Sequence, residues 1–211
     1  MKFTSKKFEE LTAAELYEIM RARNEIFVIE QNCIYQDCDD CDYGYHVFST
    51  ADAPGTAKPG AAGTAKPDAP VTAYMRIYEI QEETEVVEVD GQAIWADNAP
   101  QEKLKDAKLI AGGALSKEAN AGRKTVQMGR VLTIKHGEGL GGRLLEEGIK
   151  TAWEKMGADR IFIEAETYVI GYYEKYGFTK LSDEFLKDGI PHVQMELIKY
   201  NSNSPTKAMH D

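Results

Sequence analysis

One stretch in the second half of the chain constrains the fold more than any other. Residues 131–134 form a short apolar run, residues 137–142 are rich in glycine, and apolar side chains then recur at helical spacing as far as Gly157. This order predicts a strand, a tight turn and a helix that stops at Gly157. A continuous apolar run follows at 161–163. The unit therefore predicts a parallel crossover within an α/β protein.

Further elements can be placed on both sides of this unit. Thr12 and Glu15 fit a capping box, and an apolar stripe, interrupted by Arg23, continues to Phe27; this predicts a helix. Strands are expected at 71–78, at 85–89, from Phe178 and along Val193, Met195 and Leu197, with a second helix at about 169–176.

Two segments have a different character. Residues 51–70 are dominated by alanine, proline and glycine and carry no large apolar side chain, so they are expected to be a flexible insertion. Residues 90–123 are broken by glycines and a proline and are expected to form a second insertion, an elaborated hairpin or loop. We predict one domain over residues 1–200 with these two insertions, and a frayed tail at 201–211.

Charge and composition exclude several classes of protein. The 211 residues include 35 acidic and 25 basic side chains, a net charge of −10, which argues against nucleic acid or anionic lipid as the main partner. The chain has neither an apolar run of membrane-spanning length nor a signal-peptide pattern, so a soluble cytoplasmic protein is expected. Three cysteines cannot all pair within one chain, which favours reduced thiols.

The glycine-rich turn allows two interpretations. Consecutive glycines let main-chain N–H groups converge on a phosphate at the positive end of the following helix. A tight turn between strand and helix would carry the same glycines without binding anything. The residues alone leave both interpretations open.

The sequence of this turn can be compared with two known nucleotide-binding loops. A Walker A loop needs Lys-Ser or Lys-Thr after its last glycine, and Arg143 stands there instead. The dinucleotide fingerprint is satisfied literally by Gly137, Gly139 and Gly142, with Glu164 placed as a ribose-binding acid. Only 47 residues follow Glu164, too few for the rest of a doubly wound sheet. A dinucleotide-dependent oxidoreductase remains the alternative enzyme class.

Four runs of residues carry a family resemblance. The run 131–141, with Gly-Glu-Gly-Leu-Gly at its end, resembles the acetyl-CoA loop of the GNAT superfamily of N-acetyltransferases, and the aromatic run 171–178 resembles another element of that superfamily. The runs 30–37 and 188–192 are similar to its ElaA-like branch. These matches keep the same order and span residues 8–198, apart from the two insertions.

The resemblance implies a fold and a cofactor. The fold would be a GNAT-like three-layer αβα sandwich whose central mixed, mostly antiparallel sheet is splayed at the cofactor cleft. Acetyl-CoA would be held, without a metal, by Val131, Leu132, Thr133, His136, Gly137, Glu138, Gly139, Leu140, Gly141, Gly142 and Arg143. Two positions depart from the pattern: His136 stands where Arg or Gln is usual, and Gly171 stands where an Asn often contacts the cofactor. We expect a weaker diphosphate contact and a looser pantetheine arm.

The implied reaction transfers an acetyl group to a primary amine. Tyr173 resembles the general acid of the family; without the resemblance, an aromatic in the cluster 172–178 is expected to be part of the core. An ammonium group with a pKa of about 10.4 must lose a proton before it attacks. Glu166 is the first candidate base, and Glu164 and His192 are the others. Both glutamates could instead be solvated strand ends, and His192 could be structural.

The acidic, cysteine-containing segment after Glu30 suggests other functions. Cys33, Cys38, Cys41 and His46 could be zinc ligands, but only one pair has the close spacing that zinc sites use. A calcium loop fails because Cys41 and Phe48 occupy ligand positions. We expect no metal and interpret the aspartates as an acidic wall that attracts a cationic acceptor.

The expected partner is a small-molecule or peptide amine, with no nucleic acid and no membrane, and we allow for a homodimer. The helix from Thr12 to Phe27 and the segment after Glu30 would form the acceptor side. A non-catalytic zinc module and an acyltransferase that binds the cofactor without turnover remain alternatives.

Overall fold

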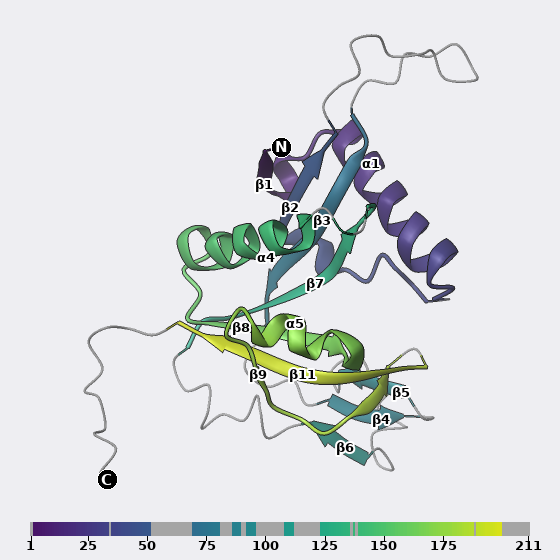
Figure 1. The fold of residues 1–211 in the computed structure, drawn as a ribbon, viewed down its shortest axis with the longest axis vertical. Coiled ribbons are helices and arrows are strands. Elements are labelled where there is room, and N and C mark those ends of the chain that lie inside the picture. Colours follow the sequence, from purple (N-terminus) through teal and green to yellow (C-terminus); the bar gives the residue numbers. More distant parts are fainter. Residues whose placement is uncertain are drawn as a thin grey trace.

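The structure is a computed structural model (Figure 1) that describes residues 2–33, 35–51, 69–80, 86–89, 92–95, 108–111, 123–135, 137, 139–187 and 189–199. Residues 52–68 of the first predicted insertion and the predicted tail at 201–211 lie outside these ranges. The prediction of one domain with a flexible insertion and a frayed tail therefore stays a prediction.

Most strands belong to one mixed sheet with the order β1-β2-β3-β7-β8-β11-β10, and β9 pairs with β11. Its strands are β1 (Phe3–Lys7), β2 (Tyr45–Thr50), β3 (Val71–Glu79), β7 (Thr125–Thr133), β8 (Arg160–Glu166), β9 (Thr179–Lys180), β10 (Phe185–Lys187) and β11 (Ile190–Ile198). β7 and β8 are parallel, and the other described pairs of this sheet are antiparallel. The predicted mixed, mostly antiparallel sheet is confirmed.

A second, smaller sheet has the order β5-β4-β6. Its strands are β4 (Val86–Val89), β5 (Gln92–Trp95) and β6 (Lys108–Ala111), and both pairings are antiparallel. β5 and β6 fall within the predicted insertion at 90–123. This region therefore contributes the two strands that pair with β4 on either side.

The helices and turns are η1 (Phe8–Glu10), α1 (Ala13–Arg23), η2 (Asn24–Glu30), η3 (Cys41–Tyr43), α4 (Leu140–Lys150), η5 (Thr151–Lys155), η6 (Thr167–Val169) and α5 (Ile170–Glu174). The predicted capping box opens α1: Thr12 Oγ1 accepts from the Glu15 amide, and the Glu15 carboxylate accepts from the Thr12 amide. Over the described residues, no helix combines the length and hydropathy that a membrane crossing needs.

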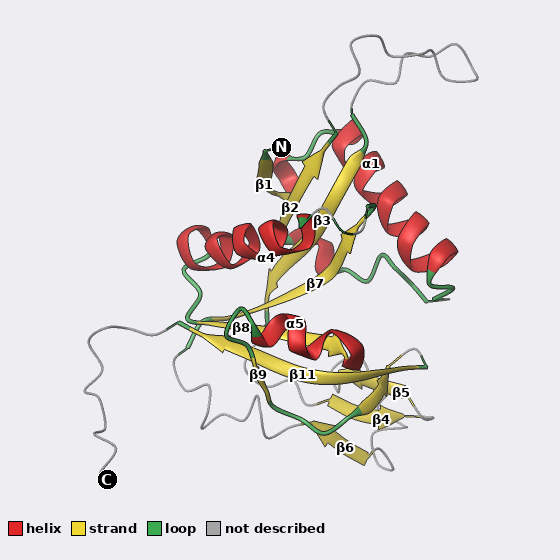
Figure 2. Ribbon diagram, in the orientation of Figure 1, coloured by secondary structure: helices red, strands yellow, loops and turns green. Residues whose placement is uncertain are grey.

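Helices cover both faces of the main sheet (Figure 2). Side chains alternate along a strand, and in β3 Ala73 and Met75 pack in one core with Leu144 of α4. Tyr74, between them, packs in a second core with Ile19 of α1. α5 adds Tyr173 to the first core. These two cores on opposite faces make the three predicted layers.

β7 and β8 part soon after they pair. The parallel ladder joins only Thr125–Gln127 to Arg160–Phe162, although β7 continues to Thr133 and β8 to Glu166. The parallel crossover and the splay of the sheet were therefore predicted correctly. One boundary was wrong: α4 begins at Leu140, so Gly141 and Gly142 belong to the helix rather than to the turn before it.

The dinucleotide alternative does not survive this topology. A doubly wound domain needs a mostly parallel sheet, whereas the described main sheet has one parallel pair. Gly137, Gly139 and Gly142 match the fingerprint in sequence without the fold that gives it a function.

Candidate active site

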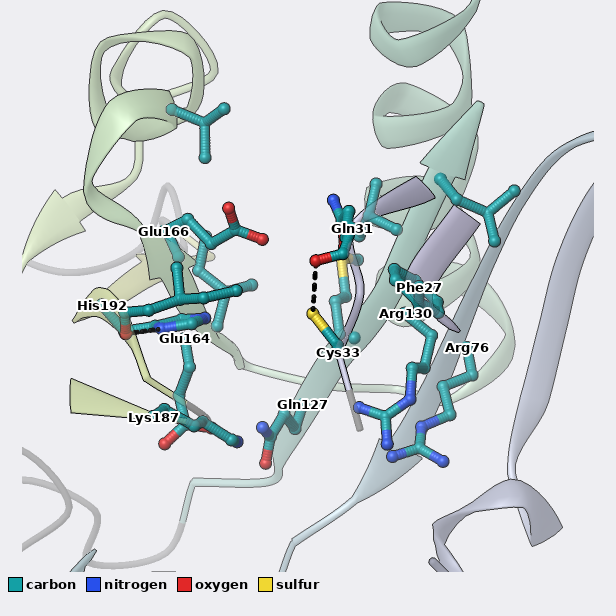
Figure 3. A pocket seen from close by; sticks show the side chains of 18 of the residues that line it. Phe27, Gln31, Cys33, Arg76, Gln127, Arg130, Glu164, Glu166, Lys187 and His192 are labelled. Carbon is teal, nitrogen blue, oxygen red and sulfur yellow. Dashed lines mark hydrogen bonds and ion pairs between the residues drawn. The ribbon is translucent and has the colours of Figure 1, made fainter. Parts of the chain in front are cut away.

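A cavity of about 560 Å³ opens where β7 and β8 part (Figure 3). It is lined by β3, β7, β8, β10 and β11, by the start of α4, by η6 and α5, and by the segment 27–41 that follows α1. Its size suits a small-molecule site. The cleft predicted beside the strand at residue 131 lies here.

A β-bulge in β7 shapes the middle of this cavity. The ladder between β3 and β7 shifts register, so Arg130 and Val131 together face the single residue Met75. Arg130 has a left-handed backbone with φ of 54°, which is costly for a residue other than glycine unless its surroundings hold it. A bulge leaves one residue out of the ladder and bends the strand, and Val131 at this bulge lines the cavity.

The residues predicted to hold the cofactor fall into three groups. Val131, Leu132, Thr133 and Gly141 line the cavity. Gly137, Gly139, Gly142 and Arg143 do not line it, although none is buried, and Leu140 is 3% exposed and packs in the core. His136 and Glu138 lie outside the described residues.

At the start of α4, three main-chain amides have no partner among the described residues. Gly139 is the N-cap, with a left-handed φ of 67° that favours glycine. The amides of Leu140, Gly141 and Gly142 precede the first intrahelical hydrogen bond, and no described residue accepts a hydrogen bond from them. Unbonded amides at the positive end of a helix dipole form an anion-binding arrangement.

Two of the glycines have a further role that the sequence did not indicate. A Cβ added to Gly142 would lie 2.4 Å from the hydroxyl of Tyr176, and one added to Gly141 would lie 3.3 Å from the hydroxyl of Tyr172. Both tyrosines come from α5 and the turn that follows it. The glycines therefore allow this aromatic segment to approach the first turn of α4.

Tyr173 is part of the core and also lines the cavity. Its ring is 8% exposed and packs against Tyr172 and Phe178, with centroids 5.3 and 5.6 Å away, yet it also lines the cavity. Burial, followed by the nearby Tyr172 and Glu166, raises the pKa of Tyr173 above its ordinary value. The phenol therefore stays protonated at neutral pH and can donate a hydrogen bond.

The two glutamates of β8 have different surroundings. The Glu164 side chain is 6% exposed and forms an ion pair with Lys187 of β10. Glu166 ends the strand, is half-buried, and lies near the exposed Tyr168. No described basic side chain forms an ion pair with Glu166, and Figure 3 shows it facing the open part of the cavity.

His192 lies directly beside Glu166. The two residues are ladder partners in β11 and β8, and both line the cavity. His192 Nδ1 is 2.8 Å from the carbonyl of Ile190, so in the neutral ring Nδ1 carries the proton and Nε2 is the free acceptor. The three predicted catalytic residues, Tyr173, Glu166 and His192, thus share one cavity.

A network of three arginines and three aspartates borders the cavity, and sequence reasoning missed it. It joins Arg23, Arg76 and Arg130 to Asp37, Asp39 and Asp42. Arg23, fully buried, reaches Asp37 at 2.9 Å. Arg130, at the bulge, reaches the same carboxylate at 2.7 Å and lies over the ring of Tyr35. These contacts hold the left-handed backbone of Arg130 in place.

The predicted acidic wall was therefore wrong for three of its members. Burial raises the pKa of Asp37 and of Asp39, but their arginine partners outweigh it and lower both below the ordinary value. The aspartates are neutralised by Arg23, Arg76 and Arg130 instead of attracting a cation. Arg23 was the available signal, because a basic residue in an apolar helical stripe needs a buried partner.

The cysteine segment does not gather as a metal site. Cys33 is buried, Cys41 is partly exposed and Cys38 is exposed. Both ring nitrogens of His46 have protein partners, the Asp42 carbonyl at 2.8 Å and the Tyr74 hydroxyl at 2.9 Å. In the part of the chain that the structure describes, no three His, Cys, Asp or Glu side chains are placed to hold a metal ion.

Comparison with known proteins gives a consistent result. Residues 102–199 match the family described as "Acetyltransferase (GNAT) domain". The chain is 24% identical to a UPF0039 protein of Schizosaccharomyces pombe, an alignment that covers 93% of this chain and 97% of the relative. It is 22% identical to the protein ElaA of Escherichia coli, over 88% of this chain and 89% of ElaA.

Solved structures agree on the fold. The crystal structure of Escherichia coli ElaA has a TM-score of 0.61 at 20% identity, covering 92% of this chain and 97% of that one. An acyl-CoA N-acyltransferase from Pseudomonas aeruginosa has a TM-score of 0.59 at 24% identity, with the same coverage of both chains. At such identities the likeness concerns the fold alone.

Proposed function

We propose that this chain is a GNAT acyltransferase and that it moves an acetyl group from acetyl-CoA to a primary amine by direct attack. One observation carries the proposal: the cavity between the parted β7 and β8 reaches Gly141 in the first turn of α4 and is also lined by Glu166 and His192. A binding site for a thioester carrier and a candidate base thus open into the same space.

The residues present fit coenzyme A. The amides of Leu140, Gly141 and Gly142 would hold its diphosphate, with Gly137, Gly139 and Arg143 at the rim. The main chain of Val131, Leu132 and Thr133 would hold the pantetheine arm and stabilise the charge that develops on the acyl oxygen. When bound, coenzyme A supplies the acyl thioester; the protein supplies the positions of the reacting groups.

Glu166 would accept the proton that the amine must lose. It is the carboxylate in the cavity without an ion-pair partner among the described residues. His192 Nε2, beside it in the ladder, is a second acceptor for the same proton. Glu164 is a weaker candidate base because its carboxylate already forms an ion pair with Lys187.

Tyr173 would stabilise the departing thiolate by donating a hydrogen bond. A thiol has a pKa of about 8.5 and a free phenol one of about 10, and burial raises the pKa of Tyr173 further. Complete proton transfer from this phenol to the sulfur is therefore uphill, whereas a hydrogen bond is favourable. A protein with weak turnover remains the second candidate, because Gly171 leaves open space where an Asn side chain would lie.

The acceptor we propose is a small-molecule or peptide amine, and we place the protein in the cytoplasm, with neither nucleic acid nor membrane as a partner. The net charge of −10 supports this setting. A homodimer is compatible with the proposal and is not needed for it, since Tyr173, Glu166 and His192 come from one chain.

Thermal-shift titration with acetyl-CoA, coenzyme A and NADH tests the binding site. A ligand that binds only the folded protein raises Tm as its concentration exceeds Kd; we expect this from acetyl-CoA and coenzyme A and not from NADH. Transfer to an alkylamine, followed by mass spectrometry, tests the reaction. Acetyl-CoA binding without any acetylated amine would favour the binding-only alternative, and no acetyl-CoA binding would overturn the proposal.

A further inference from the structure

The end of the cavity remote from α4 contains two buried polar atoms that have no hydrogen-bond partner among the described residues. Gln127 of β7 is 6% exposed, and its Oε1 has no hydrogen-bond partner. Arg76 of β3 is 3% exposed, and its Nε also has none, although its other nitrogens bind Asp39 and Asp42. Both residues line the cavity. A buried polar atom without a partner is costly, so this pair of atoms indicates a place for a ligand group.

The sheet places these two side chains on the same face, beside Gly129. Tyr78 pairs with Gln127, and Arg76 pairs with Gly129, two residues further along β7; Arg76 and Gln127 therefore project from the same face. A Cβ added to Gly129 would meet nothing within 4 Å. Figure 3 shows Gln127 between the wall that carries Glu164 and Lys187 and the wall that carries Arg76 and Arg130. The missing side chain of Gly129 leaves room for a ligand.

The charged residues around this space are already paired. Lys187 is neutralised by Glu164, and Arg76 and Arg130 by aspartates of the network. A carboxylate or a second ammonium on the ligand would lose water here without meeting an unpaired counter-ion. A neutral group that accepts from Arg76 Nε and donates to Gln127 Oε1 would satisfy both atoms.

We infer that this end of the cavity binds the acceptor through a neutral group that both donates and accepts hydrogen bonds, such as a carboxamide or a hydroxyl. The inference rests on the proposed function, because it assigns the other end of the same molecule, the reactive amine, to Glu166. Gln127 pairs with Phe162, and Glu166 lies four residues further along β8. At about 3.3 Å per residue the two positions are about 13 Å apart along the strands, so the acceptor has an extended chain.

Four amines of equal chain length test the inference: ω-aminohexanamide, ω-aminohexanoate, hexamethylenediamine and hexylamine. We expect kcat/KM for the amide to exceed that for each of the others by about tenfold or more, because each of the others leaves at least one of the two buried atoms unpaired. Gln127→Leu should reduce the ratio between amide and hexylamine to about twofold or less.

Gln194→Leu is a matched control. Gln194 is fully buried in β11, its amide atoms have no partners, and it does not line the cavity. This variant should keep the wild-type ratio. If Gln127→Leu does not fold, Gly129→Ala replaces it, since a methyl group there enters the space claimed for the amide without meeting protein atoms.

The outcomes separate the two proposals. Equal use of the amide and hexylamine by the wild-type protein, or equal loss of the ratio in Gln127→Leu and Gln194→Leu, would overturn the subsite and leave acetyl transfer intact. If no amine is acetylated, the proposed function fails. The subsite is then judged by thermal shift: ω-aminohexanamide should raise Tm of the wild-type protein but not of Gln127→Leu, and the absence of that difference rejects the subsite as well.

Discussion

The two sides of the cavity are built in different ways. The proposed cofactor side, residues 131–135, 139–143 and 167–178, presents main-chain groups over an apolar core that includes Leu144 and Phe178. The proposed acceptor side, residues 31–33 and 35–44 with Arg23, Arg76 and Arg130, is held together by ion-paired side chains. Main-chain groups suit a ligand part that every member of a family binds, whereas side chains can be exchanged. We therefore expect the acceptor side to determine selectivity.

The largest expected effect is a loss of unfolding free energy when the ion-pair network of the acceptor side is disrupted. Arg23→Met removes a fully buried guanidinium and leaves Asp37 and Asp42 short of a partner. Removing one member of a buried ion pair costs about 3–5 kcal/mol, so we expect a loss of unfolding free energy at the lower end of this range, because Arg130 and Arg76 still bind these carboxylates. Urea unfolding with an unchanged m-value measures it.

Arg21→Met, on the same helix, is the control. Arg21 is partly exposed and pairs with Glu18 and Glu25, and such surface pairs contribute about 0–1 kcal/mol. Equal losses in the two variants would mean that the buried network does not hold the acceptor side together.

The same division explains what the sequence could predict. The crossover from residue 131 to residue 163 has local signals: an apolar strand, glycines at a helix start and Gly157, which has φ of 65° after the helix. The capping box at Thr12 is equally local. Such features depend on residues a few positions apart, so one sequence is enough to identify them.

The bulge and the network have no comparable local signal. Asp37 and Arg130 are 93 residues apart, and Asp39 and Arg76 are 37 apart. Their pairing exists only after β3 and β7 have formed the sheet. Interpreted locally, the aspartates look like an exposed acidic loop, and Gln127 looks like an ordinary polar position in a strand. Tyr173, Glu166 and His192 could be nominated only because of the family resemblance.

The next effect tests the chemistry of the cofactor side. Tyr173→Phe keeps the ring contacts with Tyr172 and Phe178 and removes the hydrogen bond to the thiolate. We expect kcat to fall about 10- to 100-fold, at or below the usual range for a general acid because a thiolate is a tolerable leaving group. The Kd for acetyl-CoA should stay unchanged. Steady-state kinetics and a binding isotherm measure the two quantities.

Tyr172→Phe is the neighbouring control for that experiment. The Tyr172 ring packs beside Tyr176 and its hydroxyl has no part in the proposed chemistry, so its removal should change kcat by less than about threefold. Unchanged turnover in Tyr173→Phe would remove this residue from the mechanism.

A smaller effect tests how α5 approaches α4. Gly142→Ala places a methyl group 2.4 Å from the Tyr176 hydroxyl, and overpacking of this kind costs about 1–3 kcal/mol. If the displacement moves the first-turn amides, acetyl-CoA should bind about tenfold more weakly, which corresponds to about 1.4 kcal/mol. Tyr176→Phe removes the clashing atom, so the double variant should recover most of the affinity. If the double variant binds acetyl-CoA as weakly as Gly142→Ala does, contact with the Tyr176 hydroxyl is not the cause of the lost affinity.

The smallest expected effect is the response of the acceptor side to acid. The pKa values of Asp37 and Asp39 are lowered in the folded protein, where arginine contacts outweigh burial. A lowered folded-state pKa adds stability that is complete above the unfolded value, about 3.8, and is lost as the pH falls through the folded value. Unfolding free energy should therefore decrease below about pH 4, and Asp39→Asn should make this decrease shallower.

Measurements of Tm between about pH 2 and pH 6 test this dependence, with Asp183→Asn as the control. Asp183 is exposed and forms no described ion pair. Its replacement should therefore leave the slope of Tm against pH unchanged. Asp39→Asn with the wild-type slope would place the acid sensitivity elsewhere in the molecule. A shallower slope would locate it in the ion-paired half of the cavity, because the cofactor side offers main-chain groups that do not titrate.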